Sequence, residues 1–265
     1  MMYILAYLLL GAFAGVMGGM LGIGGGVIIV PVLIALFTWQ AFPAEVITVM
    51  AVASSLASII FTSLSAMRAQ MKRDAVDWVI FRQWSVVVVL GGFCSGFIAQ
   101  YLPALAMKQG IAVFLLIVSI IMLSQWVPKP ERQLPGPVGT GIIGFICGVA
   151  SALAGIAGGN IIVPTLVFFN VQMQRAAATA SSLGLPIATV GTLGYVIAGL
   201  DATARPEWSL GYVYLPAALS VAVMTYLMAP LGVAIAHKLP AKTLKRVFGG
   251  LLFFVASSML WSTLA

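Results

Sequence analysis

Gly22-Ile23-Gly24-Gly25-Gly26-Val27-Ile28-Ile29-Val30-Pro31 is a glycine-rich interruption of an apolar stretch, followed by an aliphatic run and a proline. A second copy lies about half a chain later, as Gly155-Ile156-Ala157-Gly158-Gly159-Asn160-Ile161-Ile162-Val163-Pro164. Hydrophobic segments that are interrupted at corresponding positions of two halves indicate a binding site near the midplane of a membrane transporter. The repetition therefore predicts both a duplicated fold and the place of its site.

Composition predicts that the chain lies in a membrane. Of 265 residues, 62% are hydrophobic and 7% are charged, whereas a soluble domain has about 25% charged residues. The net charge of +7 fits loops anchored at the cytoplasmic face of a membrane better than it fits nucleic-acid binding. We therefore expect a multi-pass membrane protein, with lipid as a partner and no nucleic acid.

The repetition continues beyond the glycine-rich breaks. Ala53-Ser54-Ser55-Leu56 corresponds to Ala180-Ser181-Ser182-Leu183, with a small shift of spacing that loops of different length explain. Each repeat then contains one broken apolar segment and three spanning helices. The predicted segments are 3–38, 43–67, 77–101 and 108–127 in the first repeat, and 137–170, 175–199, 209–237 and 242–264 in the second.

We thus predict an all-α polytopic membrane protein with two inverted repeats, each a Gly-broken or re-entrant hairpin plus three transmembrane helices. The first repeat covers residues 1–127, the second covers 137–265, and a cytoplasmic linker at 128–136 joins them. Basic residues decide the orientation, because they concentrate on the cytoplasmic side. Lys and Arg divide 7 to 6 if residues 137–170 cross once, and 11 to 2 if that segment folds back. The second division predicts inverted repeats with both termini outside.

The breaks predict anion binding. An apolar run of about 35 residues is too long for one span of about 20, so it forms either a hairpin or a broken spanning helix, and both remain open. Proline is favoured at the first helical position, which predicts that Pro31 and Pro164 begin short helices. A helix start has unpaired N–H groups and partial positive charge, and glycine lets a ligand approach it. Two such starts would face each other across a central pocket.

The serine pairs add hydroxyl donors to this site. At 1.5 Å per residue, Ser54 lies about 17 Å along a helix that begins at Pro43, near the middle of the membrane. The predicted substrate-binding residues are Gly24, Gly25, Gly26, Ser54, Ser55, Gly158, Gly159, Asn160, Ser181 and Ser182. Two structural alternatives compete with this interpretation. The spacing of Gly11, Gly15 and Gly19 is typical of close helix packing in membranes, and a serine in a helix often bonds to the carbonyl four residues earlier.

Other chemistry has little support in the sequence. Cys94 and Cys147 have no partner spacing, so we expect neither a disulfide nor a metal site. All six acidic residues lie at predicted loops or helix ends, which leaves no carboxylate to carry protons through the membrane. We expect no cofactor and no enzymatic activity, because the common catalytic motifs are absent. The alternatives to a transporter are an anion channel, an uptake permease for another small anion, a thiol relay and a membrane scaffold.

The twin Gly-Gly segments ending in Val-Pro, the Ser-Ser-Leu pairs and the four-segment repeats resemble the TauE/SafE family of sulfite and organosulfonate exporters. The resemblance covers essentially the whole chain. It implies export of a small sulfur-containing anion, such as sulfite, sulfoacetate or a related sulfonate, across a bacterial inner membrane. We expect alternating access in an inverted-repeat bundle as the mechanism. Two positions differ between the copies: Ala157 corresponds to Gly24, and Asn160 corresponds to Val27. The exact anion, the coupling ion and the oligomeric state stay open, with a homodimer as one option.

Overall fold

The computed structural model describes residues 2–21, 24–72, 74–124, 134–236 and 241–264. This part of the chain is almost entirely helical, as predicted. Its elements are α1 (Met2–Leu21), α2 (Gly26–Trp39), α3 (Ala44–Met71), α4 (Trp78–Tyr101), α5 (Ala104–Leu123), α6 (Pro137–Leu153), α7 (Gly159–Phe168), α8 (Met173–Ala198), β1 (Ser209–Leu210), β2 (Val213–Tyr214), α9 (Leu215–Ala236) and α10 (Ala241–Leu264). Most of the predicted linker, residues 128–133, lies outside the described residues.

A short β-hairpin replaces the beginning of the helix predicted at 209–237. Strands β1 and β2 pair antiparallel, and α9 begins only after them, at Leu215. Gly211 makes the turn at φ 56°, and a side chain there would collide with the carbonyl oxygen of Val196 at 2.1 Å. The prediction was wrong here because hydrophobicity alone does not show that the chain must turn at this glycine.

Each glycine-rich segment folds back on itself. The Gln40 amide at the end of α2 donates a hydrogen bond to the Tyr7 hydroxyl on α1, while Gly25 at the start of α2 lies against the Ala14 carbonyl. Helices α1 and α2 are therefore an antiparallel hairpin. Helices α6 and α7 form the second hairpin, in which Cys147 Sγ lies 4.0 Å from Thr165 Oγ1. Of the two arrangements left open by the sequence, the structure has the hairpin.

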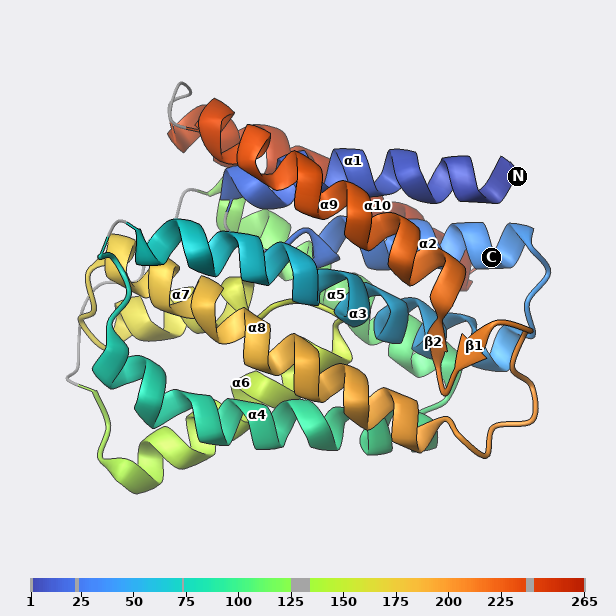
Figure 1. Ribbon diagram of the computed structural model, residues 1–265, viewed down its shortest axis with the longest axis horizontal. Coiled ribbons are helices and arrows are strands. Elements are labelled where there is room, and N and C mark those ends of the chain that lie inside the picture. The colour runs from blue at the N-terminus through green and yellow to red at the C-terminus, as the bar shows by residue number, and fades with distance from the viewer. Residues whose placement is uncertain (1, 22–23, 73, 125–133, 237–240, 265) are drawn as a thin grey trace.

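Connections of the bundle gather at its two ends (Figure 1). Both termini lie at the end that also holds the α2–α3 and α8–α9 connections and the β-hairpin. The α3–α4 and α7–α8 connections lie at the opposite end, where Asp77 and Arg175 form an ion pair. Arg68 and Lys72 close α3 at this same end, so basic residues of both halves meet there.

Each half packs its first helix against a helix of the other half. Helix α1 packs on α9 as α6 packs on α4, and α3 packs on α9 as α8 packs on α4, while α3 and α8 pack on each other. Two hydrogen bonds also join the halves in this reciprocal way. Tyr214 N–H donates to Ser54 Oγ, and Asp77 N–H donates to Thr179 Oγ1, both at 2.9 Å. This reciprocal pattern fits two related halves that interlock rather than two separate lobes. The domain limits at 127 and 137 stay a prediction.

Glycines of α1 permit its close contact with α9. A side chain at Gly11, Gly15 or Gly19 would lie within 3 Å of the backbone of α9, closest at Gly19, where it would be 2.2 Å from the Ala229 carbonyl oxygen. Small residues let membrane helices approach in this way. Close packing, one of the two structural alternatives, therefore explains these three glycines.

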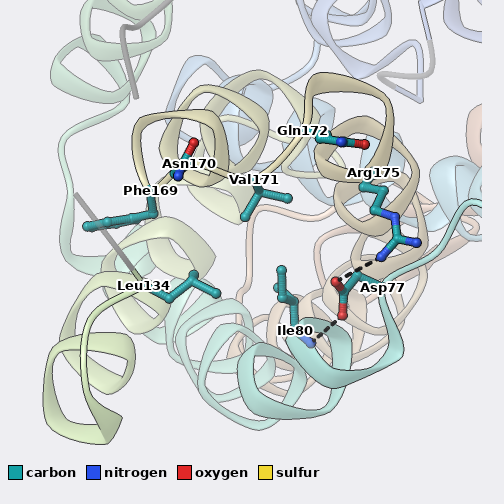
Figure 2. Close-up of a pocket in the computed structure, with 8 residues that line it drawn as sticks. All are labelled: Asp77, Ile80, Leu134, Phe169, Asn170, Val171, Gln172 and Arg175. Carbon is teal, nitrogen blue, oxygen red and sulfur yellow. Dashed lines mark hydrogen bonds and ion pairs between the residues drawn. The ribbon is translucent and has the colours of Figure 1, made fainter. Parts of the chain in front are cut away.

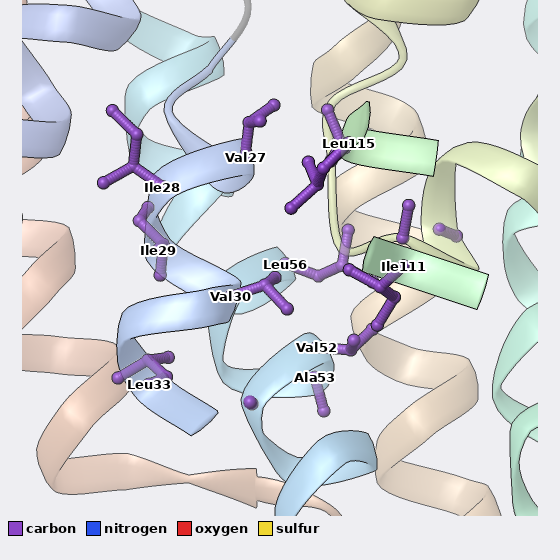
Figure 3. Close-up of a cluster of buried hydrophobic side chains, with 14 of the residues drawn as sticks. Val27, Ile28, Ile29, Val30, Leu33, Val52, Ala53, Leu56, Ile111 and Leu115 are labelled. Carbon is purple, nitrogen blue, oxygen red and sulfur yellow. The ribbon is translucent and has the colours of Figure 1, made fainter. Parts of the chain in front are cut away.

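Helix α2 is buried over most of its length. Val27, Ile29, Val30 and Leu33 are each at most 1% exposed, and Figure 3 shows them among side chains of α3 and α5. A helix that is apolar all round belongs in the interior, and interrupted backbone at membrane depth must be buried in protein or line a cavity. With 14 and 10 residues, α2 and α7 are too short to span. Six described helices, α1, α3, α4, α5, α8 and α9, are long and apolar enough to do so.

Candidate functional site

Left-handed glycines begin both short helices. Gly25 precedes α2 at φ 76° and Gly158 precedes α7 at φ 82°, a conformation that glycine adopts without steric cost. The helices therefore begin at Gly26 and Gly159, five residues before the prolines that were predicted to begin them. That prediction was wrong because the glycine conformation, rather than the fixed φ of proline, sets the start. Each proline lies inside its helix.

The two breaks meet at the centre of the molecule. A side chain at Gly26 would lie 2.3 Å from the Gly155 carbonyl oxygen, and one at Gly24 would lie 2.9 Å from Ala157 Cβ. Backbone of the first break is thus in direct contact with backbone of the second. The sequence predicted that the helix starts face each other across a central pocket; the structure instead brings the backbone of the two breaks into direct contact. Gly22 and Ile23 of the first copy lie outside the described residues.

The four predicted serines are all buried, but they point to different partners. Ser55 Oγ donates to the Gly155 carbonyl oxygen at 2.9 Å, which ties α3 to the second break. Ser54 Oγ accepts from Tyr214 N–H and ties α3 to β2. Ser182 Oγ donates to the Ala178 carbonyl of its own helix at 2.9 Å. Ser181 is 4% exposed. The structure thus places Ser55 at the breaks and gives Ser182 the local bond that was the alternative interpretation.

Unpaired polar atoms surround the second break. Asn160 Nδ2 is buried and has no hydrogen-bond partner among the described residues, and the same holds for Ser63 Oγ and Ser151 Oγ. The first hydrogen bonds of α7 are donated by Ile161 and Ile162 to the Gly158 carbonyl, so the N–H groups before Ile161 are the open donors of a helix start. Ser63 and Ser151 were not predicted, because neither belongs to a repeated motif.

Charged groups stay away from the breaks. The described acidic residues Glu45, Asp74, Asp201 and Glu207 are exposed, and Asp77 caps the start of α4 by accepting from the N–H groups of Val79 and Ile80; Glu131 lies outside the described residues. No cluster of three potential metal ligands occurs among the described residues. The chemistry at the breaks is therefore that of neutral donors and helix ends.

A cavity of about 580 Å³ opens at the end of the bundle where α7 turns into α8. Figure 2 shows Asn170, Gln172 and Arg175 on one side of it and Asp77 on the other. Arg175 Nη1 lies 3.8 Å from Asp77 Oδ2, and the Arg175 side chain is 60% exposed. Such a loose, solvated ion pair contributes little to stability. Arg175 is thus a cation available at the mouth of the cavity, which the sequence did not predict as a site residue.

An aromatic cluster fills the corresponding turn at the opposite end. Phe37 stacks on Phe42 with ring centroids 4.9 Å apart, and both meet the Tyr214 ring edge-on. Tyr7 adds a further edge contact to Phe37. Burial raises the pKa of Tyr214 above its usual value, so this ring stays neutral at physiological pH. One end of the bundle is therefore packed with rings where the other has a polar cavity.

Comparison with known proteins supplies the context for this geometry. The family model described as sulfite exporter TauE/SafE matches residues 7–259. The chain belongs to the TauE/SafE family. The matched residues include both hairpins and the twin breaks described above.

Relatives of this TauE/SafE chain are similar over their full length. A probable membrane transporter protein of Haemophilus influenzae is 31% identical over 97% of this chain and 98% of its own. A probable membrane transporter protein of Methanocaldococcus jannaschii is 26% identical over 96% and 94%, and YunE of Bacillus subtilis, also a probable membrane transporter protein, is 24% identical over 95% of each. No solved structure matches the chain. With its candidate spans, this TauE/SafE protein is a multi-pass membrane transporter.

Proposed function

We propose that the protein exports a small sulfur-containing anion, such as sulfite, sulfoacetate or a related sulfonate, by alternating access. The observation that carries the proposal is the meeting of two left-handed, glycine-capped helix starts inside an apolar bundle. Helix starts bind anions through open N–H groups and the helix dipole, without a buried cation. The description of the matching family as sulfite exporters supports a sulfur oxyanion as the substrate.

Inverted repeats follow from the hairpins. Each hairpin returns the chain to the side from which it came, and three crossings by α3, α4 and α5 then place the second hairpin on the other side. This arrangement puts Arg68, Lys72 and Arg175 on one side, which agrees with the shared end of the bundle in Figure 1. The positive-inside rule makes that side cytoplasmic, with both termini outside.

The polar cavity is then the cytoplasmic approach to the breaks. Helix α7 runs from Gly159 at the break to Phe168 beside the cavity, a distance of about 15 Å at 1.5 Å per residue. Arg175 at the cavity mouth raises the local concentration of anions. The aromatic cluster of Tyr7, Phe37, Phe42 and Tyr214 closes the external end. We propose that the substrate enters the protein from this cytoplasmic end.

Export of an anion needs no carboxylate proton carrier. With the cell interior negative, each negative charge that moves outward gains about 2.3 kcal/mol per 100 mV, and a dianion gains twice that. None of the acidic residues that the structure describes is buried at membrane depth. We therefore propose that the membrane potential drives transport at least in part.

Proteoliposomes that contain the purified protein test the proposal. Sulfite or sulfoacetate flux should saturate with concentration, exceed that of a carboxylate analogue of the same size, and increase when the side that the substrate leaves is made negative. Liposomes without protein are the control. Flux that does not saturate would indicate an anion channel instead. Transport that responds to neither potential nor pH gradient would refute the driving force proposed here, and absence of flux for every sulfur anion would refute the substrate.

A further inference from the structure

Three buried polar atoms without partners gather at the second break. Ser151 is fully buried, and its Oγ lies 3.4 Å from the position of a Cβ on Gly158. Ser63 is 2% exposed, and its Oγ lies 3.1 Å from the position of a Cβ on Gly184, which is itself 2.9 Å from Ala157 Cβ. Asn160 Nδ2 belongs to the first turn of α7. No described residue forms a hydrogen bond with any of the three atoms.

The corresponding positions around the first break are apolar. At the spacing that matches Gly25 with Gly158, Ser151 corresponds to Gly18 and Asn160 to Val27. At the spacing that matches Ser54 with Ser181, Ser63 corresponds to Val190.

The packing of the first break agrees with this difference. A side chain at Gly18 would collide with Gly25 N at 2.7 Å, so backbone fills the place that the Ser151 hydroxyl occupies in the second half. Val27 is 1% exposed and belongs to the apolar core. Ser151 and Asn160 thus have no polar counterpart at the first break, and Ser63 adds a hydroxyl near Ala157, where the two breaks meet.

Burial of a polar atom without a hydrogen bond destabilises a protein, and native proteins rarely leave such atoms unpaired. Two hydroxyls and an amide N–H beside the open N–H groups of a helix start are all able to donate. A ligand that satisfies them together must carry several acceptor oxygens on a small centre. A sulfite ion and a sulfonate head group both have three.

We propose that the protein has one anion subsite, at the start of α7, formed by the Ser63 and Ser151 hydroxyls, the Asn160 amide and the N–H groups of Gly159 and Asn160. The first break carries no such subsite. Its backbone packs directly against the second break. This inference rests on the proposed function and deepens it, because it assigns the substrate to one break and gives it an oxyanion head. Ser63, from the first half, contributes across the interface between the halves.

Exchange of each polar residue for its counterpart in the other half tests the subsite. The variants are Ser151→Gly, Ser63→Val and Asn160→Val, with Ser151→Ala as a second variant at the position where glycine adds flexibility. The control is Ser58→Ala, which also removes a fully buried hydroxyl, but one that donates within α3 to the Ser55 carbonyl. Calorimetry on detergent-purified protein measures the Kd of sulfite and sulfoacetate, with dimethyl sulfone as an uncharged probe that has similar S–O groups.

Each of the three exchanges should raise the Kd of sulfite and sulfoacetate about 10-fold or more, because each removes a hydrogen bond to a charged group. The control should stay within about twofold of the wild type, and dimethyl sulfone should not bind. The melting temperature of ligand-free Ser151→Ala, Ser63→Val and Asn160→Val should not fall, because each exchange removes an unpaired polar atom, whereas Ser151→Gly should melt slightly lower because it places a glycine, which disfavours a helix, inside α6.

Two results would overturn the subsite. If the wild type binds and transports a sulfur anion while all exchanged variants keep its Kd, the anion lies elsewhere and the transport function stands. If the exchanges lower the melting temperature of the ligand-free protein and leave the Kd unchanged, the three residues are structural. A wild type that neither binds nor transports any sulfur anion would instead refute the proposed function, and the subsite with it.

Discussion

Replacement of Gly26 by alanine tests the direct contact between the two breaks. The added methyl group would lie 2.3 Å from the Gly155 carbonyl oxygen, 2.7 Å from Ile59 Cδ1 and 3.1 Å from Ile156 Cα. The Ile59 side chain can move by a rotamer change, but the other two atoms are backbone of the second break. The breaks must therefore separate, and overpacking of this kind costs about 1–3 kcal/mol.

A matched control gives the opposite sign. Gly110 lies in α5, and a side chain there would meet nothing within 4 Å, so Gly110→Ala has no steric cost. Alanine in place of glycine inside a helix gains about 1 kcal/mol. Gly26→Ala should therefore lower the stability while Gly110→Ala raises it.

Thermal unfolding of the two variants in detergent measures this difference, and 1 kcal/mol corresponds to about 2–4 °C for a chain of this size. We expect Gly26→Ala to melt several degrees below the wild type and Gly110→Ala slightly above it. We also expect Gly26→Ala to impair transport, since the proposed anion subsite lies where the breaks meet. Equal melting temperatures for Gly26→Ala and the wild type would show that the breaks are not in contact, and the reasoning about the central site would fail with them.

Further substitutions separate structural from functional roles. Ser55→Ala leaves a carbonyl of the second break unpaired and should lower the unfolding free energy by about 1–3 kcal/mol. Ser182→Ala removes only a hydrogen bond within its own helix and should cost less than half as much. Chemical denaturation of both variants measures the difference. Arg175→Gln removes the cation at the cavity mouth and should raise the KM for export several-fold at low ionic strength. This difference should shrink as salt screens the charge. An unchanged KM would exclude the cavity as the route by which the substrate approaches. Cys94→Ala combined with Cys147→Ala should leave transport intact, because both thiols are free, and loss of flux in this double variant would favour a thiol relay.

Hydrophobic periodicity and length predicted the helices well, because apolar runs in a membrane are bounded by polar loops, glycine and proline. The segments predicted at 77–101 and 175–199 are observed at Trp78–Tyr101 and Met173–Ala198. Helix starts inside the breaks were harder to predict. Proline permits a helix start but does not impose one, and the left-handed φ of Gly25 and Gly158 cannot be derived from composition.

Sequence repetition indicates where the candidate site lies but not which side chains face it. Repetition identified the breaks, and counting residues along a helix predicted the depth of Ser54, but depth does not show which face of the helix a side chain occupies. Ser54 turns to β2, and its neighbour Ser55 turns to the break. Ser63 and Ser151 were missed because a search for repeated residues passes over positions where the halves differ.

In the proposed subsite, those differences let a duplicated bundle bind one small anion. Duplication supplies two glycine-capped helix starts and the interlocked packing that holds them together. If both breaks also carried unpaired donors, the ligand-free protein would bury twice as many unsatisfied groups, each at a cost of about 1–3 kcal/mol, while a single oxyanion could satisfy only one set. An apolar first break, packed by Val27 and Ile59, avoids that cost. Divergence between the halves is therefore where selectivity is built, and exchange of residues between them is the direct way to relocate or abolish the site.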